Sequence, residues 1–377
     1  MSVRLGDIAD FSNGINFDKT AYGQGIKMIA VSDFGNRFFP DIEQLQEVKM
    51  EVVRQGNLLE EGDIVFVRSN GNKELVGRCM LIPHLYQLLT FSGFVIRCRI
   101  LEPKWFYPRF FAYYFKTKAF RRAMGGTAVG ANIQNLSQTR LSAHVATIPD
   151  ITTQTKIANI LSSYDDLIEN NRKQIKLLEE AAQRIYKEWF IDLHFPGYET
   201  TPIVDGIPDG WEEKNVTDLL EIKYGKDHKS LADGRIPVYG SGGVMRKVDR
   251  VLYSGESVLI PRKGSLNNII YADCDFWTID TMFYSIPRIP NIAKYMYLFL
   301  SCLDMYSFNI GAAVPSMTVN ILDGIKALLP ESNILERFEN IVAPLFRKKE
   351  LLEKQSEIAT ETRDRLLPKL MTGEIEE

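Results

Sequence analysis

Two short basic segments carry the residue types best suited to contacting a polyanion, and each follows an apolar run typical of a strand. The first segment contains Arg68, Ser69, Asn70, Asn72 and Lys73, and the second contains Arg262, Lys263, Ser265 and Asn267. Arginine and lysine neutralise phosphates, and arginine and asparagine also make paired hydrogen bonds to base edges in a DNA groove. A basic turn is usually only solvated surface, but two of them at matching places favour contact with DNA.

Further polar residues extend both candidate surfaces. The second segment gains Lys223, Tyr224, Lys226, Arg246 and Lys247, and the first gains Arg121, Arg122 and Asn132. Their charge and hydrogen-bonding groups suit a duplex, although the sequence does not divide them into phosphate contacts and base contacts. We therefore treat all of them as candidate DNA contacts.

The motifs of stand-alone enzymes are missing from the chain. It contains no GxxxxGK[ST] phosphate loop, no GxGxxG after a strand, no HExxH, no GxSxG and no amino-methyltransferase tetrapeptide. Pro208 and Asp209 with Glu212 and Lys214 resemble a nuclease motif, but they are too close together to lie on separate strands that meet at a metal ion. We expect a linker turn there, and no catalytic residue in this chain.

Histidine and cysteine spacing also argues against a metal centre. The four histidines are dispersed, and Cys79, Cys98, Cys274 and Cys302 show neither CxxC spacing nor a nearby histidine pair. We expect all four cysteines to be buried apolar fillers, and no metal or cofactor to bind to this chain.

The candidate segments belong to two mixed α/β stretches that repeat one plan. The Leu5 to Ile8 stretch with Gly14 corresponds to residues 216–219 with Gly225, and the apolar runs 61–67 and 254–260 match in the same way. The offset between the copies falls from 211 to 181 because the loops differ in length. The aromatic segment 106–120 has helical spacing and is more typical of a core than of a base-stacking surface.

Each α/β stretch is followed by a long amphipathic segment with the 4-3 spacing of a coiled coil. Its seam contains Ile157, Leu161, Tyr164, Ile168, Asn171, Ile175, Leu178, Ile185 and Trp189 in the first copy, and Phe338, Val342, Leu345, Leu352, Leu366 and Leu370 in the second. Adding 181 to a first-copy number gives its counterpart. The spacing predicts two long helices that pair with each other, with a kink or restart at Pro344 in the second.

The pattern predicts an α+β fold with two similar globular domains, joined and separated by two long helices that pair with each other. The expected boundaries are 1–149 and 195–330 for the globular domains, and 150–194 and 331–377 for the helical segments. A helix from 157 to 189 would be about 50 Å long, which suits a spacer. Two long helices of an ordinary helical domain are the alternative, and the intervening globule argues against it.

Overall charge is unremarkable, but its distribution is uneven. The 377 residues carry a net charge of −3, while residues 1–148 contain 18 Lys and Arg against 13 Asp and Glu. The acidic excess lies mainly in the helical parts, which suits protein contacts better than DNA. No membrane span or apolar leader is evident, so we expect a cytoplasmic protein that does not bind membranes.

The sequence resembles the specificity subunit of Type I restriction-modification systems over essentially its whole length. The resemblance rests on the segment 157–171 (IANILSSYDDLIENN) with the continuation to Trp189 and Phe190, on the tail 366–375 (LLPKLMTGEI), and on the entry 206–211 (GIPDGW) to the second globule. We know of no other family that combines these motifs in this order.

This resemblance implies a non-catalytic subunit with two target recognition domains, each reading half of a split, asymmetric DNA target. It implies that the two long helices form an antiparallel coiled coil, which sets the spacing and docks two modification subunits that would bind S-adenosylmethionine. A translocase-nuclease subunit, using ATP and magnesium, would join them for cleavage. A scaffold that binds modification subunits without reading DNA is the competing hypothesis, and a stand-alone methyltransferase or nuclease is a third that the missing motifs disfavour.

Overall fold

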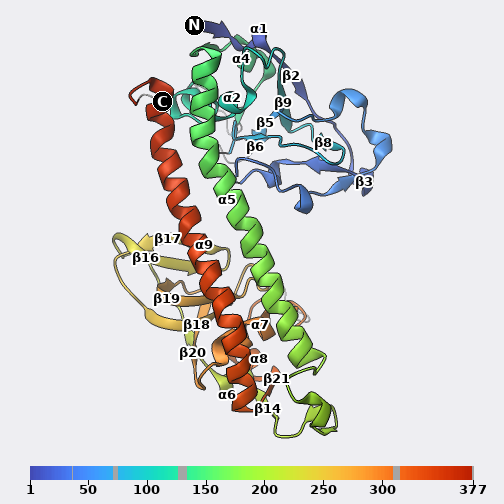
Figure 1. The fold of residues 1–377 in the computed structure, drawn as a ribbon, viewed down its shortest axis with the longest axis vertical. Coiled ribbons are helices and arrows are strands. Elements are labelled where there is room, and N and C mark those ends of the chain that lie inside the picture. The colour runs from blue at the N-terminus through green and yellow to red at the C-terminus, as the bar shows by residue number, and fades with distance from the viewer. Residues whose placement is uncertain (36, 71–74, 126–133, 309–314, 376–377) are drawn as a thin grey trace. The chain divides into compact units, whose positions relative to one another are not determined.

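The computed structural model describes residues 1–35, 37–70, 75–125, 134–308 and 315–375 (Figure 1). The chain divides into two compact units that both include part of each long helix. Unit 1 comprises Met1–Asn170 with Gln355–Glu377, and unit 2 comprises Asn171–Lys354. Within the described ranges, no helix has both the length and the hydropathy needed to cross a bilayer.

Unit 1 is built on a sheet of strand order β2-β9-β5-β7 and a smaller sheet of order β4-β3-β8. Its strands are β1 (Ser2–Arg4), β2 (Ala9–Asn13), β3 (Tyr22–Ile29), β4 (Glu47–Val48), β5 (Ile64–Val67), β6 (Ser69–Asn70), β7 (Cys79–Leu81), β8 (Leu89–Phe91), β9 (Val95–Ile100), β10 (Gln134–Asn135) and β11 (Val145–Thr147). Strand β5 is apolar throughout because its two faces enter different clusters: Ile64 and Phe66 pack in one, Val65 and Val67 in another.

The short helices of unit 1 are α1 (Leu5–Ile8), α2 (Pro108–Tyr114), α3 (Lys118–Gly125) and α4 (Gln138–Ala143). The aromatic segment therefore forms two helices rather than one. Its role as core is confirmed, because Phe110, Phe111, Phe115 and Phe120 are at most 2% exposed. These rings pack against the four-stranded sheet and the first turns of the long helix that follows.

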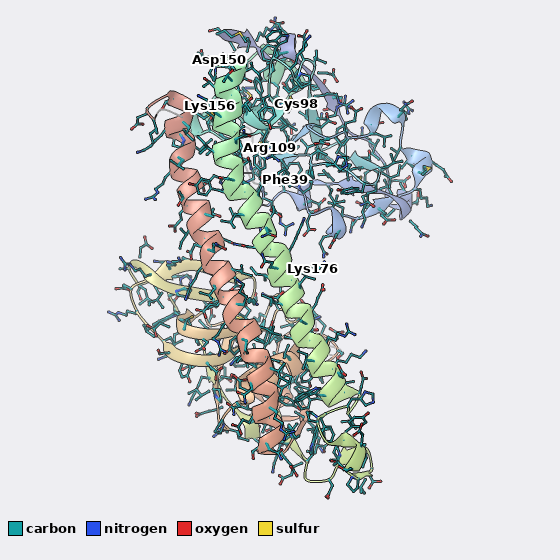
Figure 2. The ribbon with its side chains drawn as sticks, in the orientation of Figure 1. Phe39, Cys98, Arg109, Asp150, Lys156 and Lys176 are labelled. Atoms are coloured by element: carbon teal, nitrogen blue, oxygen red, sulfur yellow. The ribbon has the colours of Figure 1, made fainter. Side chains whose placement is uncertain are left out.

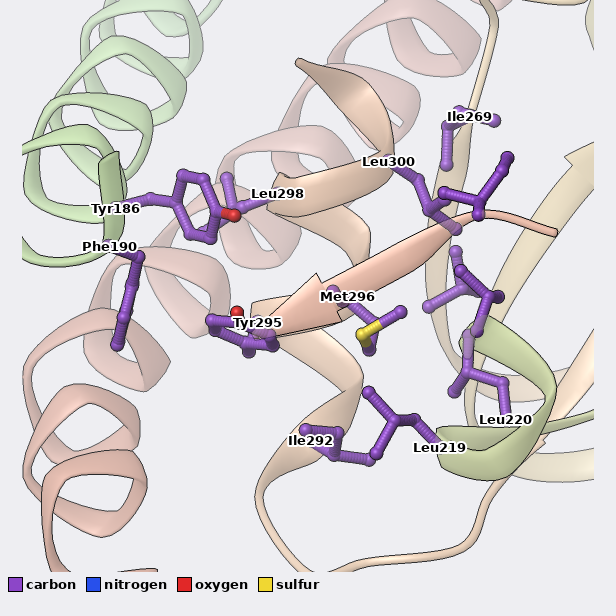
Figure 3. Packing of buried hydrophobic residues seen from close by; sticks show 14 of the residues in the cluster. Tyr186, Phe190, Leu219, Leu220, Ile269, Ile292, Tyr295, Met296, Leu298 and Leu300 are labelled. Atoms are coloured by element: carbon purple, nitrogen blue, oxygen red, sulfur yellow. The ribbon is translucent and has the colours of Figure 1, made fainter. Parts of the chain in front are cut away.

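Unit 2 has a sheet of order β15-β20-β18-β19-β16-β17 and a separate β14-β21 pair. Its strands are β12 (Ile203–Val204), β13 (Ile207–Pro208), β14 (Glu212–Asn215), β15 (Leu220–Tyr224), β16 (Asp233–Gly240), β17 (Gly243–Val248), β18 (Tyr253–Pro261), β19 (Ile270–Thr278), β20 (Met282–Pro287) and β21 (Lys326–Leu329). Its short helices are α6 (Val216–Leu219), α7 (Ile292–Ser301) and α8 (Val319–Asp323). In its core, Tyr186 and Phe190 face Tyr295 of α7 (Figure 3).

The two units share their strand pairings. Strand β3 pairs with β4 and, in parallel, with β8, while β16 pairs with β17 and, in parallel, with β19. Gly14 and Gly225 occupy the same place in both, since an added Cβ would lie 2.1 Å from the Phe91 carbonyl oxygen and 2.0 Å from that of Ile279, respectively. The units differ in one respect. In unit 2, β19 pairs with both β18 and β16, whereas in unit 1 two separate strands make the corresponding pairs, β7 with β5 and β8 with β3.

The long helices are α5 (Ile151–Tyr186), which continues into a π-helical turn (Lys187–Ile191), and α9 (Ser332–Thr372). Asp150 precedes α5 and its carboxylate accepts hydrogen bonds from the backbone N–H groups of Thr152 and Thr153 (Figure 2). These bonds satisfy two backbone donors of the first turn that would otherwise be unpaired. They also lower the pKa of the Asp150 carboxyl group.

Helix α9 is continuous through Pro344, so of the predicted kink or restart, the restart is wrong. Proline removes one backbone donor, which leaves the carbonyl of Asn340 without its usual partner. Both residues are exposed, so water can solvate that carbonyl. The stripe that contains the buried residues Phe338, Val342 and Leu352 holds the helix on both sides of the proline.

The predicted seam residues face inward in each unit. Ile157, Leu161, Ile168, Asn171, Trp189, Phe338, Val342, Leu352 and Leu370 are buried, and Tyr164, Ile175, Leu178, Ile185, Leu345 and Leu366 are half-buried. In unit 1, Ile157, Leu161 and Leu370 belong to one cluster. In unit 2, Trp189 contacts Phe338, and the Asn171 side-chain amide donates to the Leu352 carbonyl at 3.4 Å. The helices therefore pair antiparallel within each unit.

The expectation that all four cysteines are buried is half wrong. Cys79 and Cys98 are buried in unit 1, and burial raises the pKa of both thiols. Cys274 and Cys302 are exposed in unit 2. Cys274 lies in a run of three consecutive exposed residues of β19, and Cys302 follows the last turn of α7, so neither position faces the core.

Candidate nucleic-acid interface

In unit 1, the first basic segment leaves the sheet at the end of β5, and Arg68 is its anchor. Its backbone N–H donates to the Phe94 carbonyl at 2.8 Å, and its own carbonyl accepts from the Leu136 N–H at 2.9 Å. The guanidinium donates to the Gly93 carbonyl at 3.0 Å. Arg68 thus fixes the start of the segment through both backbone and side chain.

Arg262 forms the same three bonds in unit 2. Its N–H donates to the Thr281 carbonyl at 2.8 Å, its carbonyl accepts from the Met317 N–H at 2.8 Å, and its guanidinium donates to the Asp280 carbonyl at 2.7 Å. The guanidinium also lies 4.8 Å from the Tyr224 ring centre, which is within cation–π range. The structure thus brings two predicted site residues, Arg262 and Tyr224, together.

Several other predicted residues of unit 2 are tied to neighbouring protein groups. Lys223 pairs with Glu221 at 2.6 Å, and Arg246 pairs with Asp233 at 2.7 Å. The Asn267 amide donates to Asp304 at 3.1 Å, and its side-chain oxygen accepts from the Met305 N–H at 2.7 Å. Arg246 and Asn267 thereby act as braces within the unit.

The residues of this surface with mainly exposed side chains are Tyr224, Lys226, Lys247, Lys263, Ser265 and Asn267. Lys263 and Ser265 flank Gly264, whose φ of +81° gives the turn a backbone conformation that L side chains rarely adopt. The turn is held on its inner side by Tyr306, whose hydroxyl donates to the Gly264 carbonyl at 2.8 Å and accepts from the Leu266 N–H at 3.2 Å. Lys263 and Ser265 therefore project from a supported turn.

Sequence reasoning did not identify Tyr306 or Asp304 as part of this site. Both lie about 40 residues from the turn that they support. Tyrosine and aspartate at that separation carry no local signal. Only the closure of unit 2 brings them to the turn.

In unit 1, less of the predicted surface can be placed. Ser69 lies in β6, which pairs with β10 through Ser69 opposite Asn135 and Asn70 opposite Gln134. Arg121 is half-buried on α3 and burial lowers its pKa, while Arg122 is exposed on the same helix. Asn72, Lys73 and Asn132 lie outside the described residues.

In the described part of the chain, no group of three or more His, Cys, Asp or Glu side chains is arranged to hold a metal ion.

The structure thus has two repeated α/β units, each with an arginine-anchored polar turn and a share of a long helix pair. The family model for the Type I restriction modification DNA specificity domain matches residues 1–180 and 208–359. The chain therefore belongs to this family, and it is a non-catalytic specificity subunit type rather than an enzyme.

Individual relatives agree with this assignment. The chain is 27% identical over 299 residues to the Type I restriction enzyme MjaIX specificity subunit of Methanocaldococcus jannaschii, covering 70% of this chain and 68% of the relative. It is 21% identical to the HindI specificity subunit of Haemophilus influenzae, covering 70% and 74%. The crystal structure of a Type I S subunit from M. genitalium matches with a TM-score of 0.61 at 18% identity, covering 98% and 95%. That similarity supports the α+β fold.

Proposed function

We propose that this chain reads a split, asymmetric DNA target, with residues 1–149 and 195–330 as the two readers and segments 150–194 and 331–377 as spacers. The family implies DNA target recognition. The observation that carries the finer proposal is the equivalence of Arg68 and Arg262, each fixing a polar turn at the same strand end. The same anchoring of the turn in both units, combined with different turn sequences, suits two domains that read different half-sites.

The proposed contacts divide by their geometry into supports and direct readers. The supports form hydrogen bonds to other groups of the protein and thereby position the turns. They are Arg68, Arg262, Arg246 and Asn267. Lys263, Ser265, Lys226 and Lys247 expose their side chains and are the direct candidates in unit 2. Asn72, Lys73, Asn132 and Arg122 remain the direct candidates in unit 1.

We also propose that the long helices dock two modification subunits, and that a restriction subunit joins them. S-adenosylmethionine, ATP and magnesium would then be bound by those partners. The family assignment and the acidic character of the helical segments support this arrangement. Acidic helices repel phosphate and favour protein partners.

The test combines a genome-wide readout with a loop variant. Co-expression with the modification partner and mapping of methylated adenines should reveal a split motif with one fixed gap. The change Arg262→Ala with Lys263→Ala should weaken DNA binding of the partner-bound complex by well over tenfold at fixed salt, because it removes both the support of the turn and a direct contact, and one lost base contact costs about 1–3 kcal/mol. Lys326→Ala, on the separate β14-β21 pair, is the control and should bind normally.

Contrary outcomes are clear for both parts of the test. Unchanged affinity of the double variant would remove this turn from the interface. Partner binding without any methylated motif would favour a scaffold that does not read sequence.

A further inference from the structure

An exposed phenylalanine lies next to the anchoring arginine of unit 1. Phe94 occupies the turn between β8 and β9 and is 62% exposed, and its carbonyl accepts the hydrogen bond from the Arg68 N–H. Its two neighbours are fixed, because the Gly93 N–H donates to the Ile15 carbonyl at 2.7 Å and Val95 is fully buried. The ring therefore projects into solvent from a backbone that is held on both sides.

The last residue of β2, Asn13, lies beside the same turn. The residue that follows it, Gly14, donates its N–H to the Val95 carbonyl at 3.3 Å, so the end of β2 is bonded to the residue after Phe94. Asn13 is exposed. Unit 1 thus presents an amide and an apolar ring from neighbouring segments, next to the polar turn that Arg68 anchors.

The same two positions exist in unit 2, with the two kinds of side chain exchanged. The bond between the end of β2 and the start of β9 is repeated at 3.1 Å between Gly225 and the start of β20. Tyr224 is therefore the counterpart of Asn13, and Thr281 is the counterpart of Phe94. Each unit has one aromatic ring and one small polar side chain at these positions, but in the opposite order.

The side chains of unit 1 match the two halves of one kind of base pair. Phenylalanine has no hydrogen-bonding group in its side chain, so the base feature that it can distinguish in the major groove is the 5-methyl group of thymine. The asparagine amide can form two hydrogen bonds with N6 and N7 of adenine. Both preferences indicate an A·T pair.

We propose that Asn13 and Phe94 are specificity-determining residues of unit 1 that together read an A·T pair, with the amide on adenine and the ring against the thymine methyl group. This assignment rests on the proposed reading of DNA by this chain. The fixed backbone of the turn favours such a contact, because little conformational entropy is lost when the ring is placed on a base. In unit 2, Tyr224 and Thr281 give the second half-site its own preference, since both carry a hydroxyl that donates and accepts hydrogen bonds.

The first test uses the chain in complex with its modification partner and duplexes of random sequence. Selection by the wild-type complex should return a split motif with an A·T pair in one half. Asn13→Ala with Phe94→Ala should lower the preference for that pair by at least about tenfold and leave the gap and the other half unchanged. Tyr86→Ala, which removes a ring that is 95% exposed elsewhere in unit 1, is the matched control and should return the wild-type motif.

The second test isolates the methyl contact by replacing thymine with uracil at that pair. Loss of the methyl group should weaken binding of the wild-type complex by about three- to tenfold and change binding of the Phe94→Ala complex by less than about twofold. A ring with a merely structural role would leave both complexes equally sensitive to uracil.

The outcomes separate this inference from the proposed function. A split motif that the double variant retains would overturn the assignment of Asn13 and Phe94 and leave the proposed function intact, whereas a wild-type complex that selects no motif would remove both. Weaker binding of every duplex without a change in preference would also overturn the assignment, as would equal sensitivity to uracil with and without the Phe94 ring.

Discussion

Units 1 and 2 use different polar groups to hold one short helix, α2 in unit 1 and α7 in unit 2, against the rest of the unit. In unit 1, Tyr113 of α2 donates to Asp165 of α5. In unit 2, Lys294 of α7 lies between Glu256 of β18 and Glu339 of α9. The strand pairings nevertheless correspond in the two units, except that β19 combines the pairings that β7 and β8 make separately, so backbone ladders and apolar packing preserve the repeat while the polar networks diverge.

The apolar contacts compensate for these differences. Phe346 is the repeat counterpart of Asp165, and its ring lies 5.7 Å from that of Tyr297 on α7. An aromatic contact thus replaces a charged one at the same junction. In unit 1, Arg109 of α2 lies 5.6 Å from the Phe39 ring centre and pairs with Asp166 at 3.5 Å (Figure 2). Each unit has its own solution to holding a short helix on the long ones.

The largest expected effect tests whether the repeat is structurally equivalent. Gly14→Ala and Gly225→Ala should each destabilise their own unit by more than about 4 kcal/mol, because a Cβ would overlap a backbone carbonyl oxygen. Urea unfolding followed by circular dichroism would measure both. Gly35→Ala, where no atom lies within 4 Å of the added Cβ, is the control. A tolerated change in one unit alone would break the equivalence.

The next effect addresses the unlike polar networks. Arg363→Met in unit 1 and Lys294→Met in unit 2 should each cost about 3 kcal/mol, since each leaves a buried or half-buried carboxylate without its base. Hydrogen exchange should locate the loss in the unit that was changed. Equal loss of protection in both units would show that the networks are coupled rather than separate.

A smaller effect concerns the pH response of the unit 2 network. Burial by itself would raise the pKa of Glu256, but the bonds from Lys294 and Tyr271 outweigh it and lower the pKa below 4.5. The stabilisation is therefore present above pH 4.5 and is lost as the pH falls through the folded-state value. The difference in unfolding free energy between the wild type and Lys294→Met should shrink below about pH 4.5, and denaturation curves from pH 7 to 3 would show it.

The smallest effect distinguishes the units by thiol access. A maleimide should label Cys274 and Cys302 in the native protein and leave Cys79 and Cys98 unmodified, because the side chains of the latter two are buried and those of the former two are exposed. Mass spectrometry of peptides gives the pattern, and denatured protein is the control for full labelling. Native labelling at Cys98 would indicate that the core of unit 1 opens.

Much of the fold was accessible from sequence because it is written in periodic and local patterns. The 4-3 stripe identified both long helices, and the repeat at Gly14 and Gly225 located equivalent turns. The aromatic segment was correctly assigned to the core, although its division at Phe115–Thr117 was not foreseen. The restart predicted at Pro344 was wrong, because local rules ignore the packed turns on both sides of it.

The candidate site was accessible only in part. The position of both polar turns after a strand could be predicted, but the anchoring of Arg68 and Arg262 to carbonyls could not. The sequence shows that each arginine is present, but it does not show which carbonyl oxygen accepts from it. That acceptor lies 25 residues from Arg68 and 18 residues from Arg262. The same holds for Tyr306 and Asp304, which became visible only with unit 2 folded.

By itself, the sequence determined the repeated α+β plan, the two long helices and the family to which the chain belongs. Those features depend on spacing along the chain, which hydrophobic periodicity records directly. Only the tertiary structure decided that Asp165 meets Arg363, 198 residues away. Such contacts arise from chain closure, and no local pattern specifies which distant charge will be opposite.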